Sequence, residues 1–464
     1  MTSVIFPVSK GEGAAQASPL HDVGMPKSSL PEELARFVRH NTVSSRSNAS
    51  FARYIGRLLK QSGFRVSYQK KKAAGQVFVN VIGIKGKGGR PFLVCSHLDT
   101  VPPGSRAMWT TTSRNPWKAA IKNGSVYGLG TADDKGSLLA MLAAGSSVTA
   151  QELKRPLVIL GTFGEESGMG GAQLFSKAWR MPKPCCALVG EPTRLGITYR
   201  HKGLGVIEID LELPRKIDLP KKGEKAVFHF KGRQGHSSRP HLGVNALEKA
   251  MDFLARYVKS NPNARLISIE GGTAANLIPA RASLTFLKNS PRAAGFDLSG
   301  PLLLCYDSVR EMVAKLQSKG DRSFSPPVMT SNFGIAATKG RTTRLVFDFR
   351  LLPRQSIKEI SLKLKKALAH KLKPYPVKWR LRLERDNPPL ELERGHPLVQ
   401  TGIKLLKKCG LPVTLSVKPS CTEAGIYSSW GVPAIIFGPG QSNGNIHAPN
   451  ESIRIKEIEQ AVDF

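Results

Sequence analysis

Two apolar patterns alternate along the first 200 residues. Helical spacing of apolar positions predicts helices over 31–43, 49–63 and 135–152. Continuous apolar runs, typical of buried and mostly parallel strands, occur in FLVC, LVIL and CALV. Strands that alternate with helices predict a layered α/β domain with a mixed, mostly parallel sheet.

The pattern changes at about Gly203. Segments with partial apolar–polar alternation predict strands over 225–233, 264–272, 281–289 and 343–353. Amphipathic segments predict helices over 245–260, 307–318 and 357–372. Within this part, 267–286 and 331–353 form a faint repeat of strand, Gly-containing turn and strand. The mixture indicates a smaller α+β domain inserted into the first one.

The α/β pattern returns with a predicted helix over 398–410 and a strand over 432–440. We therefore predict one α/β domain, formed by 28–202 plus 389–464, that is interrupted by a domain at 203–388. Residues 1–27 are predicted to be a mobile N-terminal extension.

Composition bounds the class of protein. A chain of 464 residues has room for two or three domains, and its 41% hydrophobic content is ordinary for a globular protein. No run of about 18 apolar residues or signal peptide is apparent, so no membrane association is expected. Six cysteines without a CxxC spacing suit a reduced, cytoplasmic protein.

The net charge of +35 is unusual and has two readings. A nucleic-acid-binding protein would need such charge, whereas a generally basic surface would need no nucleic acid. The basic residues occur in small clusters, at 70–72, 363–366 and 404–408, and none is interleaved with aromatic residues. We expect no specific nucleic-acid partner, and a surface that attracts anionic substrates.

Acids and histidines gather where predicted strands end. His97 and Asp99, two apart after FLVCS, share one face of a strand, so Asp99 can reach the second ring nitrogen of a ligating His97. Taken alone, such a pair is more often structural. Further candidates of this kind follow other apolar runs or lie in Gly-rich turns: Asp133, Asp134, Glu165, Glu166, Glu191 and His447.

These nitrogen and oxygen donors suit zinc, with cobalt or manganese as substitutes. They exceed what one zinc ion needs, so the pattern favours two metals that share a carboxylate, which is an arrangement used for hydrolysis.

Six segments resemble one enzyme family in content and order. They read SHLDTVP, YGLGTADDKG, GTFGEESG, GEPT, GHSSRPHLGVNA and GPGQSNGNIHAPNE. Together they are similar to the di-zinc aminoacylase/carboxypeptidase family, which includes acetylornithine deacetylase, succinyl-diaminopimelate desuccinylase, carboxypeptidase G and peptidase V. The resemblance covers about 28–464, and RHKG and CTEA are most similar to acetylornithine deacetylase. It implies a zinc-hydrolase domain interrupted by a ferredoxin-like lid or dimerisation domain.

The resemblance also implies roles for individual residues. His97, Asp133 and Glu191 would bind one Zn²⁺, while His447, Asp133 and Glu166 would bind the other. Glu165 would be the general base and Asp99 would orient His97. In the inserted domain, His236 would stabilise the oxyanion, Arg350 would hold the substrate carboxylate and Asn276 would assist. A cis peptide bond is expected between Asp133 and Asp134, with Asp134 supported by Lys135 or backbone donors.

The implied reaction is metal-dependent hydrolysis of an amide bond beside a free carboxylate. Deacylation of an N-acyl amino acid is the first expectation, and dipeptidase or carboxypeptidase action on a short peptide is the alternative. A catalytically dead, basic nucleic-acid-binding or scaffold protein is a distant third. The extra residues between 288 and 344 leave two quaternary states open, a homodimer or a monomer in which the enlarged lid replaces the partner.

Overall fold

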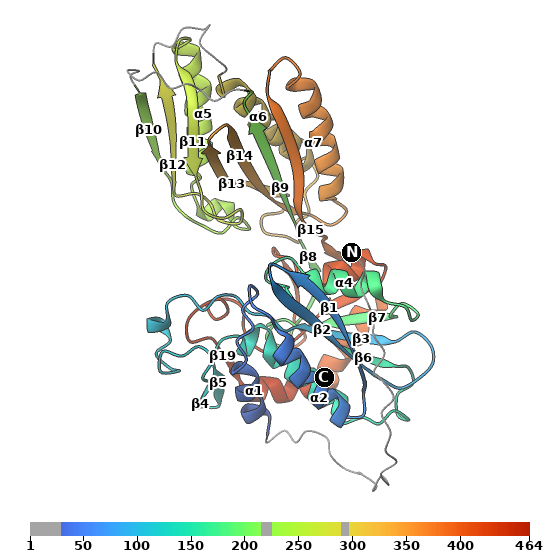
Figure 1. Cartoon of the computed structure of the whole chain (residues 1–464). Helices are drawn as coiled ribbons and strands as arrows, with labels where there is room; N and C mark the ends of the chain where they lie inside the picture. The colour runs from blue at the N-terminus through green and yellow to red at the C-terminus, as the bar shows by residue number, and fades with distance from the viewer. Residues whose placement is uncertain (1–28, 215–224, 289–296) are drawn as a thin grey trace. The chain divides into compact units, whose positions relative to one another are not determined.

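The computed structural model describes residues 29–214, 225–288 and 297–464, which form two compact units (Figure 1). The first unit combines the described part of Met1–Arg200 with Leu390–Val417 and Thr422–Phe464. The second combines His201–Pro389 with Lys418–Cys421, where the sequence predicted an insertion at 203–388. The predicted extension 1–27 lies outside the described residues.

The first unit is built on a mixed sheet with the strand order β1-β2-β6-β3-β7-β18-β8-β16, and β17 pairs with β8. Its central strands β6, β3, β7 and β18 are parallel, whereas β1 with β2, β2 with β6 and β18 with β8 pair antiparallel. The predicted mixed α/β class is confirmed, but the parallel pairs are confined to the centre of the sheet. The strands are β1 (Arg65–Ala73), β2 (Gln76–Lys85), β3 (Phe92–His97), β6 (Leu157–Thr162), β7 (Cys186–Val189), β8 (Ile197–His201), β16 (Leu390–Glu391), β17 (Leu415–Lys418) and β18 (Ala434–Ile436). A small separate sheet contains β4 (Ala120–Lys122), β5 (Ser125–Tyr127) and β19 (Ser452–Arg454).

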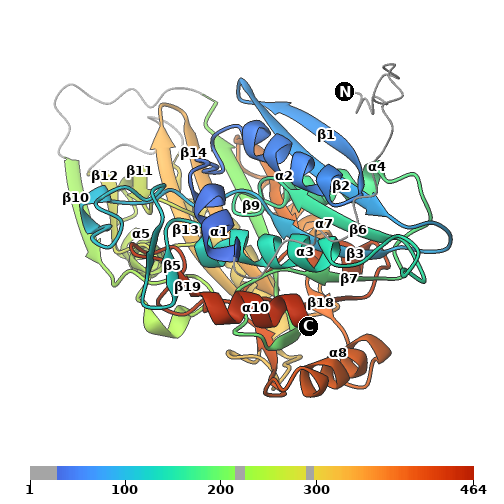
Figure 2. The ribbon, with the colours of Figure 1, turned by 90° about the horizontal axis from the view of Figure 1, so that it is seen from below.

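Helices cover both faces of this sheet. The helices are α1 (Leu30–Val38), α2 (Ala49–Gln61), α3 (Gly136–Ser146), α4 (Gly170–Ala178), α8 (Pro397–Lys408), α9 (Ala424–Ser429) and α10 (Ile455–Asp463), with a short turn η2 (Arg106–Met108). Helices α1, α3 and α10 pack together, as Figure 2 shows, and share a core with Val94. The next residue, Cys95, points to the opposite face and contacts Tyr427 of α9. The carboxyl ends of the parallel strands lie between these layers.

The second unit is an antiparallel sheet with the strand order β10-β12-β11-β13-β14-β9-β15. The strands are β9 (Gly203–Glu212), β10 (Lys225–Lys231), β11 (Arg265–Gly271), β12 (Arg281–Leu287), β13 (Thr330–Lys339), β14 (Thr342–Leu351) and β15 (Lys378–Asn387). Its helices are α5 (Ala246–Ser260), α6 (Ser299–Gln317) and α7 (Ile357–Lys371), with a short turn η4 (Pro240–Leu242). The three helices bury their apolar faces against the sheet in one core. Helix α6 begins before the predicted position 307.

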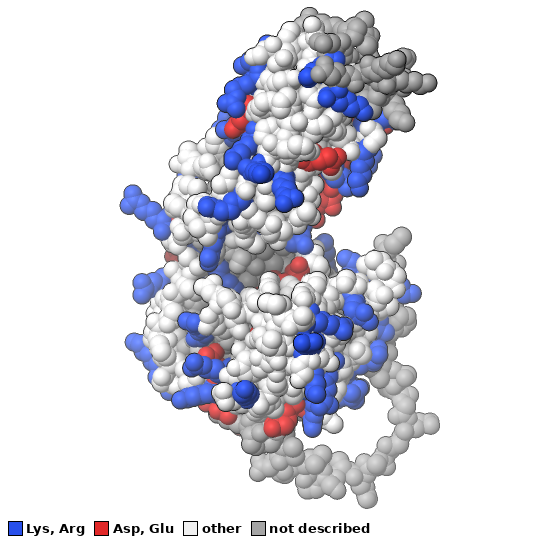
Figure 3. Space-filling view, turned by 90° about the vertical axis from the view of Figure 1, so that its left-hand side faces the viewer, with Lys and Arg blue, Asp and Glu red and all other residues white. Residues whose placement is uncertain are grey.

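Three sequence expectations bear on the surface and setting of the protein. No helix among the described residues is long and apolar enough to cross a membrane. All six cysteines are free, and the cytoplasmic location stays a prediction. Basic side chains are scattered over both units on the face shown in Figure 3, with far fewer acidic ones among them.

Candidate metal centre

His97 ends β3 and is buried, with 2% of its side chain exposed. Its Nε2 lies 2.9 Å from Oδ1 of Asp133, and its Nδ1 lies 2.9 Å from the backbone carbonyl oxygen of Asp99. The carboxylate of Asp99 is farther from Nδ1, at 3.7 Å. Asp99 therefore orients the ring through its main chain, where the sequence predicted contact through its carboxylate.

Asp133 lies in the buried turn η3 (Thr131–Lys135), which joins Gly130 to the start of α3. The peptide bond between Asp133 and Asp134 is cis, which confirms that expectation. While Oδ1 faces His97, Oδ2 lies 3.1 Å from Nε2 of His447. One carboxylate is thus shared by two histidines that are 350 positions apart in the sequence (447 − 97).

Glu165 and Glu166 follow β6, after a glycine with a left-handed backbone (φ 71°) at Gly164. The Asp99 carboxylate accepts the backbone N–H groups of both glutamates, at 3.0 and 3.3 Å. Oε1 of Glu166 lies 2.9 Å from Nε2 of His447. Asp99 therefore holds the turn that carries both glutamates as well as the ring of His97.

His447 comes from the last loop of the chain and keeps 48% of its side chain exposed. It has a left-handed backbone conformation (φ 57°), which costs a non-glycine residue about 1 kcal/mol or more and is often found at functional sites. The donor cluster is therefore exposed to solvent at His447.

The charges of the cluster depend on one another. Burial alone would lower the pKa of both histidines, but the neighbouring carboxylates outweigh it, raising the pKa of His97 well above its usual value and that of His447 to about 11. Burial acts to raise the pKa of Asp133, yet the two histidines bring it well below normal. Burial, together with the charges of Glu191 and Glu166, raises the pKa of Glu165 well above normal. Excess negative charge at this place favours bound cations.

The donor set fits divalent metals. Single donor atoms of His97, Glu165 and Glu166 lie within 4.8 Å of one another, as do those of Asp133, Glu166 and His447. The second group is one of the two predicted ligand sets. Glu191 is not in either group, but it is buried and its charge acts on Glu165. Imidazole nitrogens and carboxylate oxygens are the donors that zinc, cobalt and manganese accept.

Asp134 has a different hydrogen-bond partner from Asp133. Its Oδ2 accepts the hydroxyl of Ser96 at 2.7 Å. Lys135, predicted as a support, instead donates to the carbonyl oxygens of Phe37 and His40. Burial raises the pKa of Asp134 well above normal. Its carboxyl is buried and hydrogen-bonded to Ser96, and it supports the turn.

Glu451 is a functional residue that the sequence analysis missed. Its carboxylate is buried and accepts the backbone N–H groups of Gly130, Ala132 and Asp133 at 2.8, 2.9 and 3.0 Å. Because Glu451 follows His447 by four positions, it joins the last loop to the turn that carries the shared carboxylate. The available signal was an acid directly after the Gly/Asn-rich loop of His447.

A second buried acid lies behind His97. Glu423, in the CTEA segment, accepts hydrogen bonds from the hydroxyl of Thr162 at 2.8 Å and the thiol of Cys95 at 3.2 Å. Burial raises the pKa of Glu423 to about 7. Since Cys95 and Thr162 belong to β3 and β6, Glu423 braces the two strands whose ends carry His97 and Glu165.

The remaining predicted residues gather within the second unit. Arg350 of β14 is buried and donates from Nε and Nη2 to Asp348, at 3.0 and 3.1 Å. Its Nη2 also donates to the hydroxyl of Ser237 at 3.0 Å. The backbone N–H of Ser237 donates to the carbonyl oxygen of Asn276 at 3.0 Å. Ser237 thus joins Arg350 and Asn276, and His236 is its immediate neighbour.

Two contacts fix this second cluster. The ring Nδ1 of His236 lies 2.7 Å from the hydroxyl of Ser238. Asn332 of β13, which the sequence analysis did not single out, donates from its amide to the carbonyl oxygens of Ala275 and Leu277, at 2.8 and 2.9 Å. Asn332 therefore holds the turn that contains Asn276.

Several solved structures share this fold. The aminoacylhistidine dipeptidase from Vibrio alginolyticus superposes with a TM-score of 0.65 at 16% identity, over 96% of this chain and 97% of that one. The M20 family metallo-carboxypeptidase from Sulfolobus solfataricus gives 0.59 at 20% identity, over 94% and 97%. A peptidase of the M20 family from Bacillus subtilis, described as dinuclear metal binding, gives 0.51 at 12% identity, over 94% and 96%.

The sequence itself gives the stronger assignment. Residues 93–464 match peptidase family M20/M25/M40, a match that includes every predicted metal ligand and the whole inserted unit. With the donor cluster described above, this match shows that the chain belongs to peptidase family M20/M25/M40 and is a metallohydrolase of linear amide or peptide bonds.

Proposed function

We propose that this protein hydrolyses short peptides at the bond next to a free carboxylate, as a dipeptidase or carboxypeptidase. The observation that carries the proposal is the Asp133 carboxylate, whose two oxygens face His97 and His447. A carboxylate presented in this way is suited to bridge two divalent cations, and paired cations are a hydrolytic arrangement.

His97, Asp133 and Glu191 would hold one cation, and His447, Asp133 and Glu166 the other. Two Zn²⁺ ions are the proposed pair, and when bound they would lower the pKa of water and polarise the scissile carbonyl. The protein's own contribution is to orient the donors. Asp99 fixes His97 and the glutamate turn, and Glu451 fixes the turn of Asp133.

Glu165 is the proposed general base. Its side chain lies among the donor atoms of the first group, and its carboxylate can take a proton from water and return it to the leaving nitrogen. Burial, together with the neighbouring acids, raises the pKa of Glu165 and makes its carboxylate form unfavourable in the metal-free protein. Divalent cations held by the neighbouring donors would favour the carboxylate form of Glu165 because they attract negative charge.

The cluster of the second unit is proposed to recognise the substrate. Within the described ranges, Nε and Nη2 of Arg350 donate to Asp348 and Ser237, so Nη1 is the nitrogen left for a substrate carboxylate. His236 is exposed and held by Ser238, as a donor to the oxyanion should be. His236, Asn276 and Arg350 belong to the same unit, and both quaternary states, a homodimer and a monomer, stay predictions.

Deacylation of N-acyl amino acids, acetylornithine among them, is the second candidate. The RHKG and CTEA segments favour it. The solved relatives named above include a dipeptidase and a carboxypeptidase, which favours peptides instead. Both reactions place a free carboxylate beside the bond that is cleaved, so the same recognition cluster serves either.

A substrate panel separates these candidates. The full-length protein would be stripped of metal, reloaded with Zn²⁺, Co²⁺ or Mn²⁺, and assayed with dipeptides, the same dipeptides as C-terminal amides, and N-acyl amino acids. We expect the protein to hydrolyse dipeptides and chelators to abolish this activity. The C-terminal amides of the same dipeptides should not be hydrolysed. Turnover of N-acyl amino acids alone would establish deacylation. Salt-sensitive nucleic-acid binding without metal or turnover would refute both and favour a scaffold protein.

A further inference from the structure

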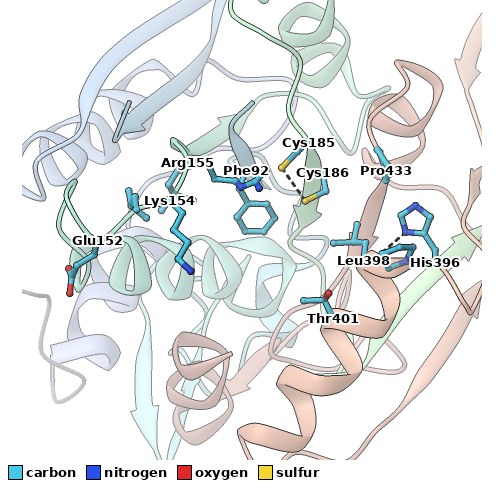
Figure 4. Close-up of a pocket in the computed structure, with 13 residues that line it drawn as sticks. Phe92, Glu152, Lys154, Arg155, Cys185, Cys186, His396, Leu398, Thr401 and Pro433 are labelled. Atoms are coloured by element: carbon cyan, nitrogen blue, oxygen red, sulfur yellow. Dashed lines mark hydrogen bonds between the residues drawn. The ribbon is translucent and has the colours of Figure 1, made fainter. Parts of the chain in front are cut away.

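A pocket of the first unit, separate from the metal-donor cluster, is lined by a pair of thiols. It has a volume of about 530 Å³ and contains none of the clustered metal donors (Figure 4). Cys185 and Cys186 are adjacent in the sequence, both are half-buried, and both line this pocket. Their sulfur atoms lie 3.6 Å apart. A disulfide bond is about 2.0 Å long, so the two sulfurs are in contact and unbonded.

Two basic residues and a histidine line the same pocket as the thiols. Lys154 and Arg155 line the same pocket on one side of the thiols, and Leu398 and His396 lie on the other side in Figure 4. Arg90 donates to the carbonyl oxygens of Lys183 and Pro184, just before Cys185. The one acid that lines the pocket, Glu152, already accepts the backbone N–H and the hydroxyl of Thr149. An anionic small molecule is therefore favoured at this place.

We propose that Cys185 and Cys186 form a site of thiol–disulfide exchange with a small anionic disulfide such as oxidised glutathione. The thiolate of Cys185 attacks one sulfur of the reagent, a mixed disulfide forms, and one glutathione thiolate leaves. The sulfur of Cys186 then displaces the second glutathione, which takes up the proton of Cys186. The reagent is reduced to two thiols, and the two cysteines are oxidised to a ring between neighbouring residues.

The order of attack follows from the surroundings of the two sulfurs. Cys186 opens β7 and also lines an apolar groove formed by residues such as Val94, Leu188 and Ile435. Burial, followed by the neighbouring Cys185, raises the pKa of Cys186 to about 12. Because the thiolate is the reactive form, Cys186 reacts as the second thiol, after Cys185 has been joined to the reagent.

The test uses the folded full-length protein and four variants. Wild type, Cys185→Ser, Cys186→Ser and the matched control Cys409→Ser are treated with oxidised glutathione, quenched with acid, alkylated and analysed by peptide mass spectrometry. Cys409 is also half-buried and free, but it does not line this pocket. The double variant Lys154→Gln/Arg155→Gln is compared with wild type using oxidised glutathione and an uncharged disulfide.

In wild type and Cys409→Ser we expect neither Cys185 nor Cys186 to be alkylated after treatment. The mass of the peptide that contains both cysteines should fall by that of two hydrogen atoms. In Cys186→Ser the reaction should stop at a glutathione adduct on Cys185. In Cys185→Ser the remaining thiol should react at about one tenth of the wild-type rate or more slowly. The double variant should react several-fold more slowly than wild type with oxidised glutathione. Its rate with the uncharged disulfide should equal that of wild type. A stable adduct on wild-type Cys185, or alkylation of both thiols after treatment, would overturn the exchange site. Equal rates of the double variant and wild type with oxidised glutathione would overturn its selectivity for anions.

Discussion

Glu451 accepts the backbone N–H of Asp133 at 3.0 Å, although 318 positions separate the two residues. The same carboxylate accepts two further backbone N–H groups, from Gly130 and Ala132, so it holds the turn that carries the shared carboxylate. A side chain that acts on a ligand's main chain is a positioning residue, and its loss should be seen first in metal binding.

Glu451→Gln should weaken metal binding by about 10–100-fold, because the amide nitrogen cannot accept a backbone N–H. Calorimetric titration of the metal-free protein with Zn²⁺ measures the effect directly. Glu457→Gln is the matched control, since Glu457 also accepts a backbone N–H, from Gly440 at 2.7 Å, but belongs to neither donor group. Equal affinities for wild type and Glu451→Gln would show that the turn holds its position without this carboxylate.

Asp133→Ala and Asp134→Asn should differ in kind. Asp133→Ala removes the oxygens that face both histidines, so we expect loss of activity and of at least one bound metal per chain. Asp134→Asn keeps a side chain that can still accept the Ser96 hydroxyl, so its metal content should stay near wild type with a smaller loss of activity. Metal analysis after gel filtration, with kcat for a cleaved dipeptide, measures both. Equal losses in the two variants would contradict the assignment of the bridge to Asp133.

Ser237→Ala should raise KM several-fold with little change in kcat. The hydroxyl of Ser237 accepts from Nη2 of Arg350, and its loss frees the guanidinium to move at a stability cost of about 1 kcal/mol. Arg350→Ala would be a poor test, because it leaves Asp348 buried without its partner, at a cost of about 3–5 kcal/mol. A KM that is unchanged for dipeptides would show that Ser237 does not position Arg350 for carboxylate recognition.

His201 should make the protein sensitive to acid. It is buried, and burial lowers its pKa from 6.5 to about 3. Between these two values the unfolded chain binds a proton that the folded chain does not, so stability falls as the pH is lowered through 6.5 toward 3. The slope should be on the order of 1 kcal/mol per pH unit. Urea unfolding at pH 7, 5.5 and 4.5 measures it, and His201→Gln should show a shallower slope than wild type.

Three buried strands of the first sheet were predictable from the sequence, whereas the edge strands β1 and β15 were not. The apolar runs of β3, β6 and β7 appear where predicted because their strands are covered on both faces. The edge strands β1 (RVSYQKKKA) and β15 (KWRLRLERDN) carry mostly polar residues, so their composition indicates no strand. The helices of the second unit were predicted from their apolar faces, except the first turns of α6.

The site divides along similar lines. Ligands could be predicted because histidines and acids at strand ends have a recognisable place in a sequence, as with His97, Asp133 and His447. Residues that act on the backbone have no such spacing, and both Glu451 and the Asp99 carboxylate bind main-chain amides that only the folded chain brings to them. The role of Ser237 likewise depends on β14, more than 100 positions away.

The strand order of the first unit has a consequence for synthesis of the chain. Strand β18 lies between β7 and β8, although more than 230 residues separate it from either strand along the chain. The second unit, apart from Lys418–Cys421, has by then left the ribosome and can fold, since domains fold largely as units. The first sheet must keep an open seam until β18 emerges, and His447 follows only afterwards. The nascent chain can therefore complete the donor cluster only after His447 has emerged from the ribosome.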